Sequence, residues 1–327
     1  MGHSVLVTGA AGFIGGHCCR ALLEQGHRVI GIDNFDPFYQ RELKEQALAE
    51  LRSREGFRFV EGDIRDGSLL APSLSGVDAV LHLAARAGVR PSIESPELYA
   101  SINVAGTVTL LEACRQAGIR RFVFGSSSSV YGDSTPVPFR EDAPVADPIS
   151  PYAATKRAGE LFCRVYAHLH GFRIAALRFF TVYGPRQRPD LAIHRFTRLL
   201  SEGRPIPQFG DGSSERDYTH IDDILNGVSG ALRWTEPAEP GFEVFNLGES
   251  RTVRLDQLIA LIGEAMGVTP AIERHPPMPG DVRRTCADVD KARRVLGYRP
   301  GISIETGIAA FVAWFQARHD RTSPKRS

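Results

Sequence analysis

Gly9-Ala10-Ala11-Gly12-Phe13-Ile14-Gly15 is the stretch that decides the fold, and it directly follows the apolar run Ser4–Thr8. Glycines allow a tight turn and let backbone N–H groups approach a pyrophosphate. The N-terminus of the helix that follows favours the negative charge. The spacing Gly-x-x-Gly-x-x-Gly therefore predicts a dinucleotide-binding turn, with Phe13 and Ile14 among its contacts. A tight glycine turn without a ligand is the alternative.

Short β-branched runs alternate with helical patterns through the first half of the chain. This alternation predicts an α/β fold with a Rossmann-type, doubly wound parallel sheet. The expected strands are Ser4–Thr8, Arg28–Ile32, Phe57–Glu61, Ala79–Leu83, Arg121–Phe124 and Arg173–Arg178, and the expected helices cover residues 14–25, 40–54, 97–117 and 153–170. Ligands of such sheets bind at the carboxyl ends of the strands.

The second half of the chain has a different pattern, because proline and glycine become frequent from Phe179 onward. Helices are expected over residues 192–202, 221–233, 255–266 and 303–318. We predict a dinucleotide-binding domain over residues 1–178 plus about 220–247, a smaller mixed α/β substrate-binding domain over 179–219 and 248–320, and a disordered tail over 321–327.

Composition excludes several classes of protein. The 327 residues are 43% hydrophobic and carry a formal net charge of +1, so there is no basic field for nucleic acid. We expect no membrane span, since no apolar run approaches the roughly 20 residues required, and no secretory leader. The five cysteines include no Cys-x-x-Cys, which predicts reduced thiols, a cytoplasmic protein and no metal site.

Acidic residues end the second and third expected strands. Asp33 stands where a carboxylate accepts hydrogen bonds from an adenosine ribose and repels a 2′-phosphate, so we expect NAD as the cofactor rather than NADP. Asp63 ends the third strand and is expected to meet the adenine. The further cofactor contacts that we expect are Asn34, Ile64, Leu83, Ala84, Ala85, Asn103 and Val182.

Tyr152 and Lys156 lie four residues apart on an expected helix and therefore share one of its faces. A nearby ammonium lowers the pKa of a tyrosine from about 10, and such a tyrosine acts as a general base near neutral pH. The four serines Ser126–Ser129 follow an expected strand, where buried hydroxyls need partners. We expect these partners to be Tyr152 and a polyhydroxylated ligand. An exposed tyrosine and a solvated serine loop are the alternatives.

Together these motifs resemble the extended short-chain dehydrogenase/reductases and, among them, the nucleotide-sugar epimerases. The similarity extends over nearly the whole chain and includes the segments His82–Ala85, Arg178–Pro185, Arg216–Tyr218 and Gly280–Arg283. It implies that Tyr152 is the base, that Lys156 lowers its pKa and holds the nicotinamide ribose, and that Ser127 hydrogen-bonds the reacting oxygen. It also implies 4-epimerisation of a UDP-sugar through a 4-keto intermediate, with tightly bound NAD regenerated in each turnover.

Related activities differ at Ser128 and Ser129. Dehydratases that resemble this family carry Asp-Glu before Val-Tyr-Gly, and decarboxylases usually carry a glutamate there. The segments 34–57 and 180–190 resemble UDP-glucuronate 4-epimerases, so the expected reaction converts UDP-glucuronate to UDP-galacturonate. Four alternatives stay open: a UDP-glucose or UDP-N-acetylglucosamine 4-epimerase (the small Thr285 leaves room at C2), a UDP-glucuronate decarboxylase, an NAD(P)H-dependent reductase, and a non-catalytic NAD-binding protein.

A nucleotide sugar needs cations for its diphosphate, and guanidinium groups match phosphate oxygens. Hydroxyls of Ser128 and Thr181 are expected to hold the C6 carboxylate of the sugar. The expected substrate contacts are Arg90, Ser127, Ser128, Ser129, Tyr152, Thr181, Arg188, Arg195, Gln208, Phe209, Arg216, Asp281 and Arg283.

The expected helices over 97–117 and 153–170 carry more apolar residues than one core-facing stripe requires. These residues are Leu98, Ile102, Leu110, Leu111, Leu161, Phe162, Val165 and Leu169. The family resemblance implies that the two helices pair across a two-fold axis, so a homodimer with a four-helix bundle is expected.

Overall fold

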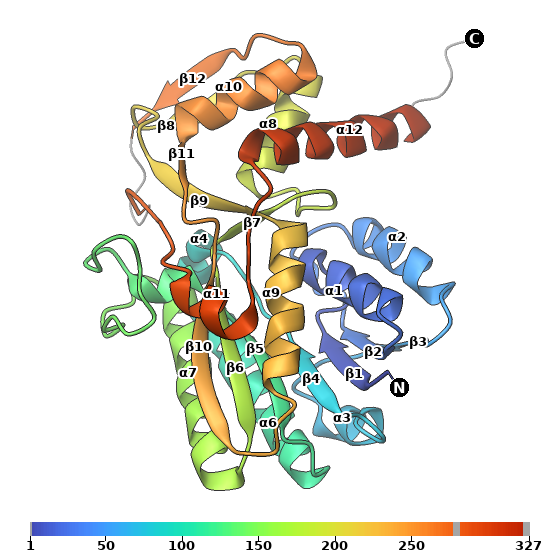
Figure 1. Cartoon of the computed structure of the whole chain (residues 1–327). Helices are drawn as coiled ribbons and strands as arrows, with labels where there is room; N and C mark the ends of the chain where they lie inside the picture. Colours follow the sequence, from blue (N-terminus) through green and yellow to red (C-terminus); the bar gives the residue numbers. More distant parts are fainter. Residues whose placement is uncertain (1, 277–281, 323–327) are drawn as a thin grey trace.

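A seven-stranded parallel sheet forms the centre of the molecule in the computed structural model, which describes residues 2–276 and 282–322 (Figure 1). The strand order is β10-β6-β5-β4-β1-β2-β3, and each neighbouring pair is parallel. The predicted Rossmann-type sheet is confirmed. Its strands are β1 (Ser4–Thr8), β2 (Arg28–Asp33), β3 (Phe57–Glu61), β4 (Ala79–His82), β5 (Arg121–Ser127), β6 (Arg173–Phe179) and β10 (Gly241–Leu247).

Strand β5 extends three residues beyond its predicted end at Phe124, because it stays in register with β6. Gly125, Ser126 and Ser127 pair with Leu177, Arg178 and Phe179. The first two of the four serines therefore belong to the sheet, and the loop expected there begins later. It opens with the 3₁₀ turn η2 (Ser128–Tyr131).

Helices cover both faces of this sheet (Figure 1). They are α1 (Phe13–Glu24), α2 (Arg41–Arg52), α3 (Gly67–Ser73), α4 (Val89–Glu94), α5 (Pro96–Tyr99), α6 (Gly106–Gln116), α7 (Pro151–His170), α9 (Ile221–Trp234) and α11 (Asp290–Leu296). Helix α7 begins where the side chain of Ser150 accepts a hydrogen bond from the Ala153 amide, and it ends at Gly171 with a φ of +69°.

The helix predicted over residues 97–117 is not one continuous α-helix. It consists of α5, a π-helical turn η1 (Ala100–Ala105) and α6. Asn103 lies within the π-helical turn, and its buried amide group bonds to the backbone of Arg86. Such turns often occur where a helix supports a functional segment.

The smaller part of the molecule packs at one end of the central sheet, at the top of Figure 1. Its core contains Tyr183, Phe196, Leu258 and Phe311. Its elements are the three-stranded sheet of β7 (Thr181–Tyr183), β9 (Glu215–His220) and β11 (Thr252–Arg254), the pair β8 (Ile206–Phe209) and β12 (Ile272–His275), and the helices α8 (Ala192–Ser201), α10 (Leu255–Met266) and α12 (Ile304–Thr322). The predicted tail over 321–327 overlaps the end of α12, and residues 323–327 lie outside the described part.

Two features are absent from residues 2–276 and 282–322. No helix in these ranges is long and apolar enough to cross a membrane, and no group of three or more His, Cys, Asp or Glu side chains is arranged to hold a metal ion. The cysteines are free thiols, and all except Cys286 are buried.

Candidate active site

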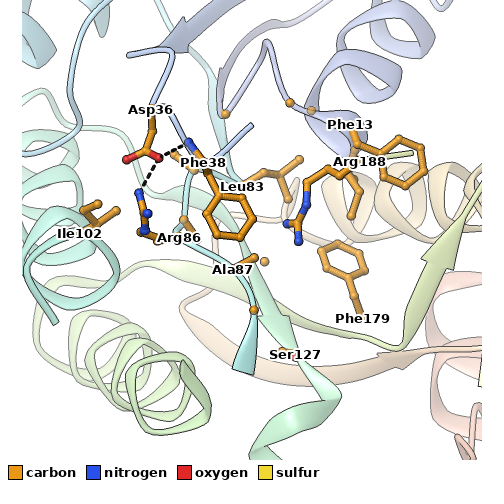
Figure 2. Close-up of a pocket in the computed structure, with 18 of the residues that line it drawn as sticks. Phe13, Asp36, Phe38, Leu83, Arg86, Ala87, Ile102, Ser127, Phe179 and Arg188 are labelled. Atoms are coloured by element: carbon orange, nitrogen blue, oxygen red, sulfur yellow. Dashed lines mark hydrogen bonds and ion pairs between the residues drawn. The ribbon is translucent and has the colours of Figure 1, made fainter. Parts of the chain in front are cut away.

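A cleft of about 490 Å³ opens at the carboxyl ends of the strands, where Phe13, Leu83 and Ser127 lie around it (Figure 2). Its lining brings the glycine turn, the serines and Tyr152 together. Almost all of the expected cofactor residues line it. They are Gly9, Gly12, Phe13, Ile14, Gly15, Asp33, Asn34, Asp63, Ile64, Leu83, Ala84, Ala85, Tyr152, Lys156 and Val182. Asn103 is not among the lining residues, since its side chain is turned to the backbone of Arg86 and to Thr155.

The glycine turn has no room for side chains at two of its positions. A Cβ atom at Gly15 would lie 2.0 Å from the Gly9 carbonyl oxygen, and one at Gly9 would lie 2.9 Å from the Ala84 nitrogen. Gly9 also has a φ of +74°, which disfavours other residues. Helix α1 then starts without a side-chain cap or an acidic residue in its first turn, so its N–H groups can receive an anion. This arrangement fits a dinucleotide pyrophosphate.

Asp33 connects the end of β2 to the glycine turn. Its carboxylate accepts hydrogen bonds from the Ala11 amide at 3.1 Å and from the Phe35 amide at 2.8 Å. Burial raises the pKa of this carboxyl group, while Lys44 and the two amides oppose the rise. The position fits an acceptor for ribose hydroxyls.

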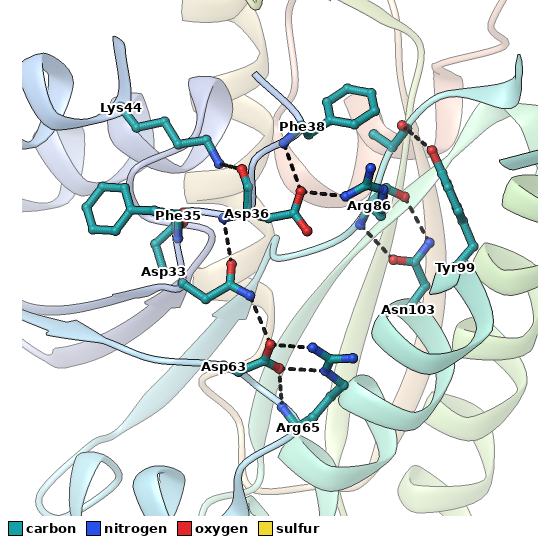
Figure 3. A network of polar contacts seen from close by, with 12 residues as sticks. Asp33, Phe35, Asp36, Phe38, Lys44, Asp63, Arg65, Arg86, Tyr99 and Asn103 are labelled. Atoms are coloured by element: carbon teal, nitrogen blue, oxygen red, sulfur yellow. Dashed lines mark hydrogen bonds and ion pairs between the residues drawn. The ribbon is translucent and has the colours of Figure 1, made fainter. Parts of the chain in front are cut away.

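Asp63 lies at the outer end of the cleft in a polar network (Figure 3). It accepts hydrogen bonds from the Asn34 amide group at 2.9 Å and from Arg65 at 2.7 Å. The bond from Arg65 is the main cause that lowers the pKa of Asp63 to about 2. An ionised acceptor therefore stands beside the segment expected to meet the adenine.

Tyr152 and Ser127 face each other across the cleft, one from α7 and the other from the end of β5. Burial raises the pKa of Tyr152, and a hydrogen bond with Ser127 and the charge of Arg188 act in the opposite direction. Lys156 is buried and donates a hydrogen bond to the Gly125 carbonyl oxygen at 2.7 Å. Lys156 is not among the groups that shift the pKa of Tyr152 here, so the lowering of that pKa by Lys156 stays a prediction.

The four serines divide into two groups. Ser127 donates to Ser129 Oγ at 3.1 Å and accepts from the Ser129 amide at 3.2 Å, on the cleft side. Ser126 instead donates to the buried carboxylate of Glu160 at 2.7 Å. The expectation that these hydroxyls pair with Tyr152 and a polyhydroxylated ligand is wrong for Ser126, whose partner is the carboxylate of Glu160.

Glu160 is a residue that the sequence analysis missed. It lies one helical turn beyond Lys156 and is fully buried. Arg178 of β6, also buried, donates to both of its oxygens at 2.8 and 2.9 Å, and Arg157 donates at 3.0 Å. Together with the bond from Ser126, this ion pair joins helix α7 to the strands β5 and β6.

Other missed residues form the wall of the cleft between β2 and α2. They include Asp36, Phe38, Tyr39 and Lys44, and Arg86 lies opposite them after β4. Segment 34–57 contributed to the prediction only through its resemblance to known enzymes. Asp36 and Phe38, which follow shortly after Asp33, were the signal in the sequence from which this wall of the cleft could have been predicted.

The expected substrate residues fall into two sets. The first set lines the cleft and consists of Ser127, Ser128, Ser129, Tyr152, Thr181 and Arg188. The guanidinium carbon of Arg188 lies 5.1 Å from the ring centre of Phe38, and its Nη2 pairs with Asp190 at 2.8 Å. The second set does not line the cleft and consists of Arg90, Arg195, Gln208, Phe209, Arg216 and Arg283.

The second set lies mainly on the smaller part of the molecule. Arg90 lies 5.6 Å from the ring centre of Phe209, which stacks on His275. Arg216 and Arg283 are neighbours, since the Glu215 amide donates to the Arg283 carbonyl and Arg216 Nη1 donates to the Glu215 carbonyl. Asp281 lies outside the described residues.

The apolar residues expected at a helix surface also divide. Ile102, Leu110 and Leu111 are buried in the core, so the prediction of an uncovered surface is wrong for them. A continuous exposed face does occur on α7. It is made by Leu161, Phe162, Val165 and Leu169, which are 48%, 37%, 45% and 64% exposed.

The sequence matches the NAD dependent epimerase/dehydratase family over residues 5–248. It is 42% identical to a UDP-glucuronate 4-epimerase from Thermodesulfobacterium geofontis over 94% of this chain and 95% of that protein. The fold is similar to the UDP-glucuronic acid 4-epimerase of Bacillus cereus in complex with UDP-glucuronic acid and NAD. That comparison has a TM-score of 0.89 and 37% identity, and it covers 96% of this chain and 99% of the other.

The same fold also supports a different reaction. The dTDP-glucose 4,6-dehydratase DesIV from Streptomyces venezuelae has a TM-score of 0.89 and 33% identity to this chain, covering 97% of this chain and 98% of the other. Backbone similarity therefore does not decide between epimerisation and dehydration, and the side chains of the cleft must.

Proposed function

Because the chain belongs to the NAD dependent epimerase/dehydratase family, we propose that it interconverts UDP-glucuronate and UDP-galacturonate by epimerisation at C4. The observation that carries the proposal is the placement of Ser127, Ser128 and Tyr152 in one cleft with the glycine turn. The names of relatives about 40% identical over nearly the whole chain support the choice of sugar.

The glycine turn and Asp33 would hold NAD, which would supply the acceptor for a hydride from C4 of the sugar and the donor that returns it to the other face. Tyr152 accepts the proton of the 4-hydroxyl group as the hydride leaves and gives it back when the hydride returns. Ser127 donates a hydrogen bond to the oxygen on C4, where negative charge develops. Lys156 places its ammonium beneath the serine strand, at the Gly125 carbonyl.

Serines at positions 128 and 129 support epimerisation over elimination. Loss of water across C5 and C6 needs an acid and a base beside the sugar. Ser128 and Ser129 line the cleft at these positions, and a serine hydroxyl cannot take either role near neutral pH.

The C6 carboxylate presents a separate problem. Once C4 is a ketone, the carboxylate stands β to it, and CO₂ can leave when the C5–C6 bond is perpendicular to the carbonyl plane. We propose that Ser128 and Thr181, which line the cleft from η2 and β7, hold the carboxylate away from this alignment. Hydroxyl groups can do so in either orientation of the ring.

The test is to incubate the purified protein, without added NAD, with UDP-glucuronate, UDP-glucose and UDP-N-acetylglucosamine and to separate the products. We expect UDP-galacturonate from the first sugar. A UDP-pentose as the sole product would indicate a decarboxylase, and turnover of the other sugars alone would change the substrate. Steady consumption of added NADH would indicate a reductase. Bound NAD without any turnover would leave a non-catalytic NAD-binding protein.

We also propose that a second copy of the chain covers the exposed apolar face of α7. Leu161, Phe162, Val165 and Leu169 lie on one side of a 20-residue helix, an arrangement suited to helix pairing. Light scattering is expected to give a dimer, and Val165→Glu a monomer. A monomeric unmodified protein would contradict the proposal.

A further inference from the structure

Two segments meet above the glycine turn. The sheet order places β1 between β4 and β2, so the segments that follow β2 and β4 lie on opposite sides of the turn that ends β1. Neighbouring strands are about 4.8 Å apart, and a contact between these segments therefore spans about 10 Å. Asp36 and Arg86 make this contact, with Arg86 Nη1 donating to Asp36 Oδ1 at 2.6 Å (Figure 3). The ion pair thus bridges the cleft where the turn would receive a pyrophosphate.

Both ends of the bridge are held in place by other bonds. Asp36 Oδ1 also accepts from the Phe38 amide at 3.0 Å, and the Asp36 carbonyl accepts from Lys44 Nζ at 2.7 Å. On the other side, the amide group of Asn103 bonds to both the N–H and the carbonyl of Arg86, at 2.8 and 3.0 Å. Because these anchors already order the two segments, the ion pair forms at little further cost in entropy.

Phe38 extends the bridge toward the substrate side of the cleft. The guanidinium carbons of Arg86 and Arg188 each lie 5.1 Å from the centre of its ring (Figure 2). A Cβ atom at Gly88 would lie 3.7 Å from the tip of the same ring. The ring is therefore held between the segment after β4 and the loop that carries Arg188.

The bridge also brings positive charge into the cleft. Arg86 and Arg188 both line the cleft, and the buried Nε of Arg86 has no hydrogen-bond partner within residues 2–276 and 282–322. A diphosphate in the cleft would meet this donor as well as the N-terminus of α1.

We propose that Asp36, Phe38 and Arg86 form a strap that retains the dinucleotide in the cleft through successive turnovers. The inference rests on the proposed function, in which the cofactor is regenerated in every cycle and has no need to leave. Asp36 and Arg86 must separate before a dinucleotide can pass between the segments. The ion pair therefore controls the rate of cofactor release, which is distinct from the proton transfer at Tyr152.

The test compares NAD release from the purified holoenzyme and from the variants Arg86→Gln, Asp36→Asn and their combination. Bound NAD is counted after gel filtration, and its release is followed at 340 nm with excess alcohol dehydrogenase and ethanol as a trap. Arg54→Gln is the matched control, because Arg54 pairs with Glu24 at 3.1 Å and neither residue lines the cleft.

We expect Asp36→Asn to release NAD about tenfold faster than the unmodified protein. Arg86→Gln should release it at least as fast, because Arg86 also faces the diphosphate, and the double variant should match Arg86→Gln, since the ion pair is then already lost. Added NAD should raise the activity of the variants and leave that of the control unchanged. Release at the unmodified rate from both single variants would overturn the strap. Faster release from Arg86→Gln alone would overturn it too, because it would assign the effect to direct attraction between Arg86 and the diphosphate.

The failure of this proposal can be told apart from the failure of the proposed function. If the unmodified protein holds NAD, the variants release it faster and no UDP-sugar is converted, then only the proposed function is wrong. A protein that epimerises UDP-glucuronate while its variants retain NAD would overturn only the strap. Circular dichroism melts identify any variant that fails to fold. Arg86→Lys, which keeps the charge, then serves as the replacement. It should retain NAD longer than Asp36→Asn.

Discussion

Replacing Lys156 with methionine is expected to make the protein more stable and inactive. Lys156 is 6% exposed, and its ammonium group donates a hydrogen bond to the Gly125 carbonyl oxygen at 2.7 Å. Burial lowers the pKa of Lys156 from 10.5 to about 8. At about 1.4 kcal/mol per pH unit, keeping this lysine charged in the folded protein costs about 3 kcal/mol at pH 7.

The sign of the effect follows from the protons bound in each state. Between pH 8 and 10.5 the folded protein binds fewer protons at Lys156 than the unfolded chain, so the free energy of unfolding rises with pH in this window. Lys156→Met removes the cost but also loses the bond to Gly125, worth about 1 kcal/mol. The variant should be about 2 kcal/mol more stable than the unmodified protein at pH 7, and this advantage should disappear toward pH 10.5.

The assay is urea unfolding at pH 7 and at about pH 9.5, combined with the rate of epimerisation. Lys291→Met is the control, because Lys291 pairs with Glu243 at 2.5 Å away from the cleft and its loss should lower stability at both pH values. A Lys156→Met variant that is less stable than the unmodified protein at pH 7, or whose advantage does not shrink at higher pH, would refute the reasoning.

Three further predictions concern groups around the same cleft. Arg178→Met should lower the free energy of unfolding by about 3 kcal/mol, because the carboxylate of Glu160 stays buried with fewer donors. A decrease in the free energy of unfolding below about 1 kcal/mol, measured in urea, would argue against the ion pair as a structural link. Tyr152→Phe should reduce epimerisation by about a thousandfold or more while leaving bound NAD in place, and a smaller loss would point to another base. Thr181→Ala should release more UDP-pentose from UDP-glucuronate, and unchanged pentose formation together with an unchanged epimerisation rate would remove Thr181 from the control of C6.

The central sheet could be predicted from the sequence because its signals are local. The strands β1 and β3 have the bounds that the apolar runs predict, and the glycine turn after β1 can be recognised without tertiary information. The short strands β8 and β12 could not be predicted, since they exist through pairing with each other across more than sixty residues. The π-helical turn η1 escaped prediction for a similar reason, as the bonds of Asn103 join it to a distant loop.

Motif residues of the site were predictable, but their supporting partners were not. Gly9–Gly15, Tyr152 and Lys156 have fixed spacings that chemistry requires. Asp36 and Arg86 are 50 positions apart, and Glu160 and Arg178 are 18 apart. In each pair the two residues belong to different segments, so a periodicity within one helix or strand cannot reveal the contact, and only the tertiary arrangement brings these charges together.

The surroundings of Tyr152 include a charge that spacing along the helix could not predict. Four residues along a helix place Lys156 on the same face as the phenol, but its ammonium is directed to the Gly125 carbonyl. The cation that lowers the pKa of Tyr152 against the effect of burial is Arg188, from the loop that follows β7. Arg188 also lies against Phe38, and Phe38 lies against Arg86. A change in the proposed strap should therefore reach Tyr152, the proposed general base, through Arg188. The pH dependence of the epimerisation rate in Asp36→Asn should then differ from that of the unmodified protein even with NAD in excess. An identical pH profile would separate cofactor retention from proton transfer.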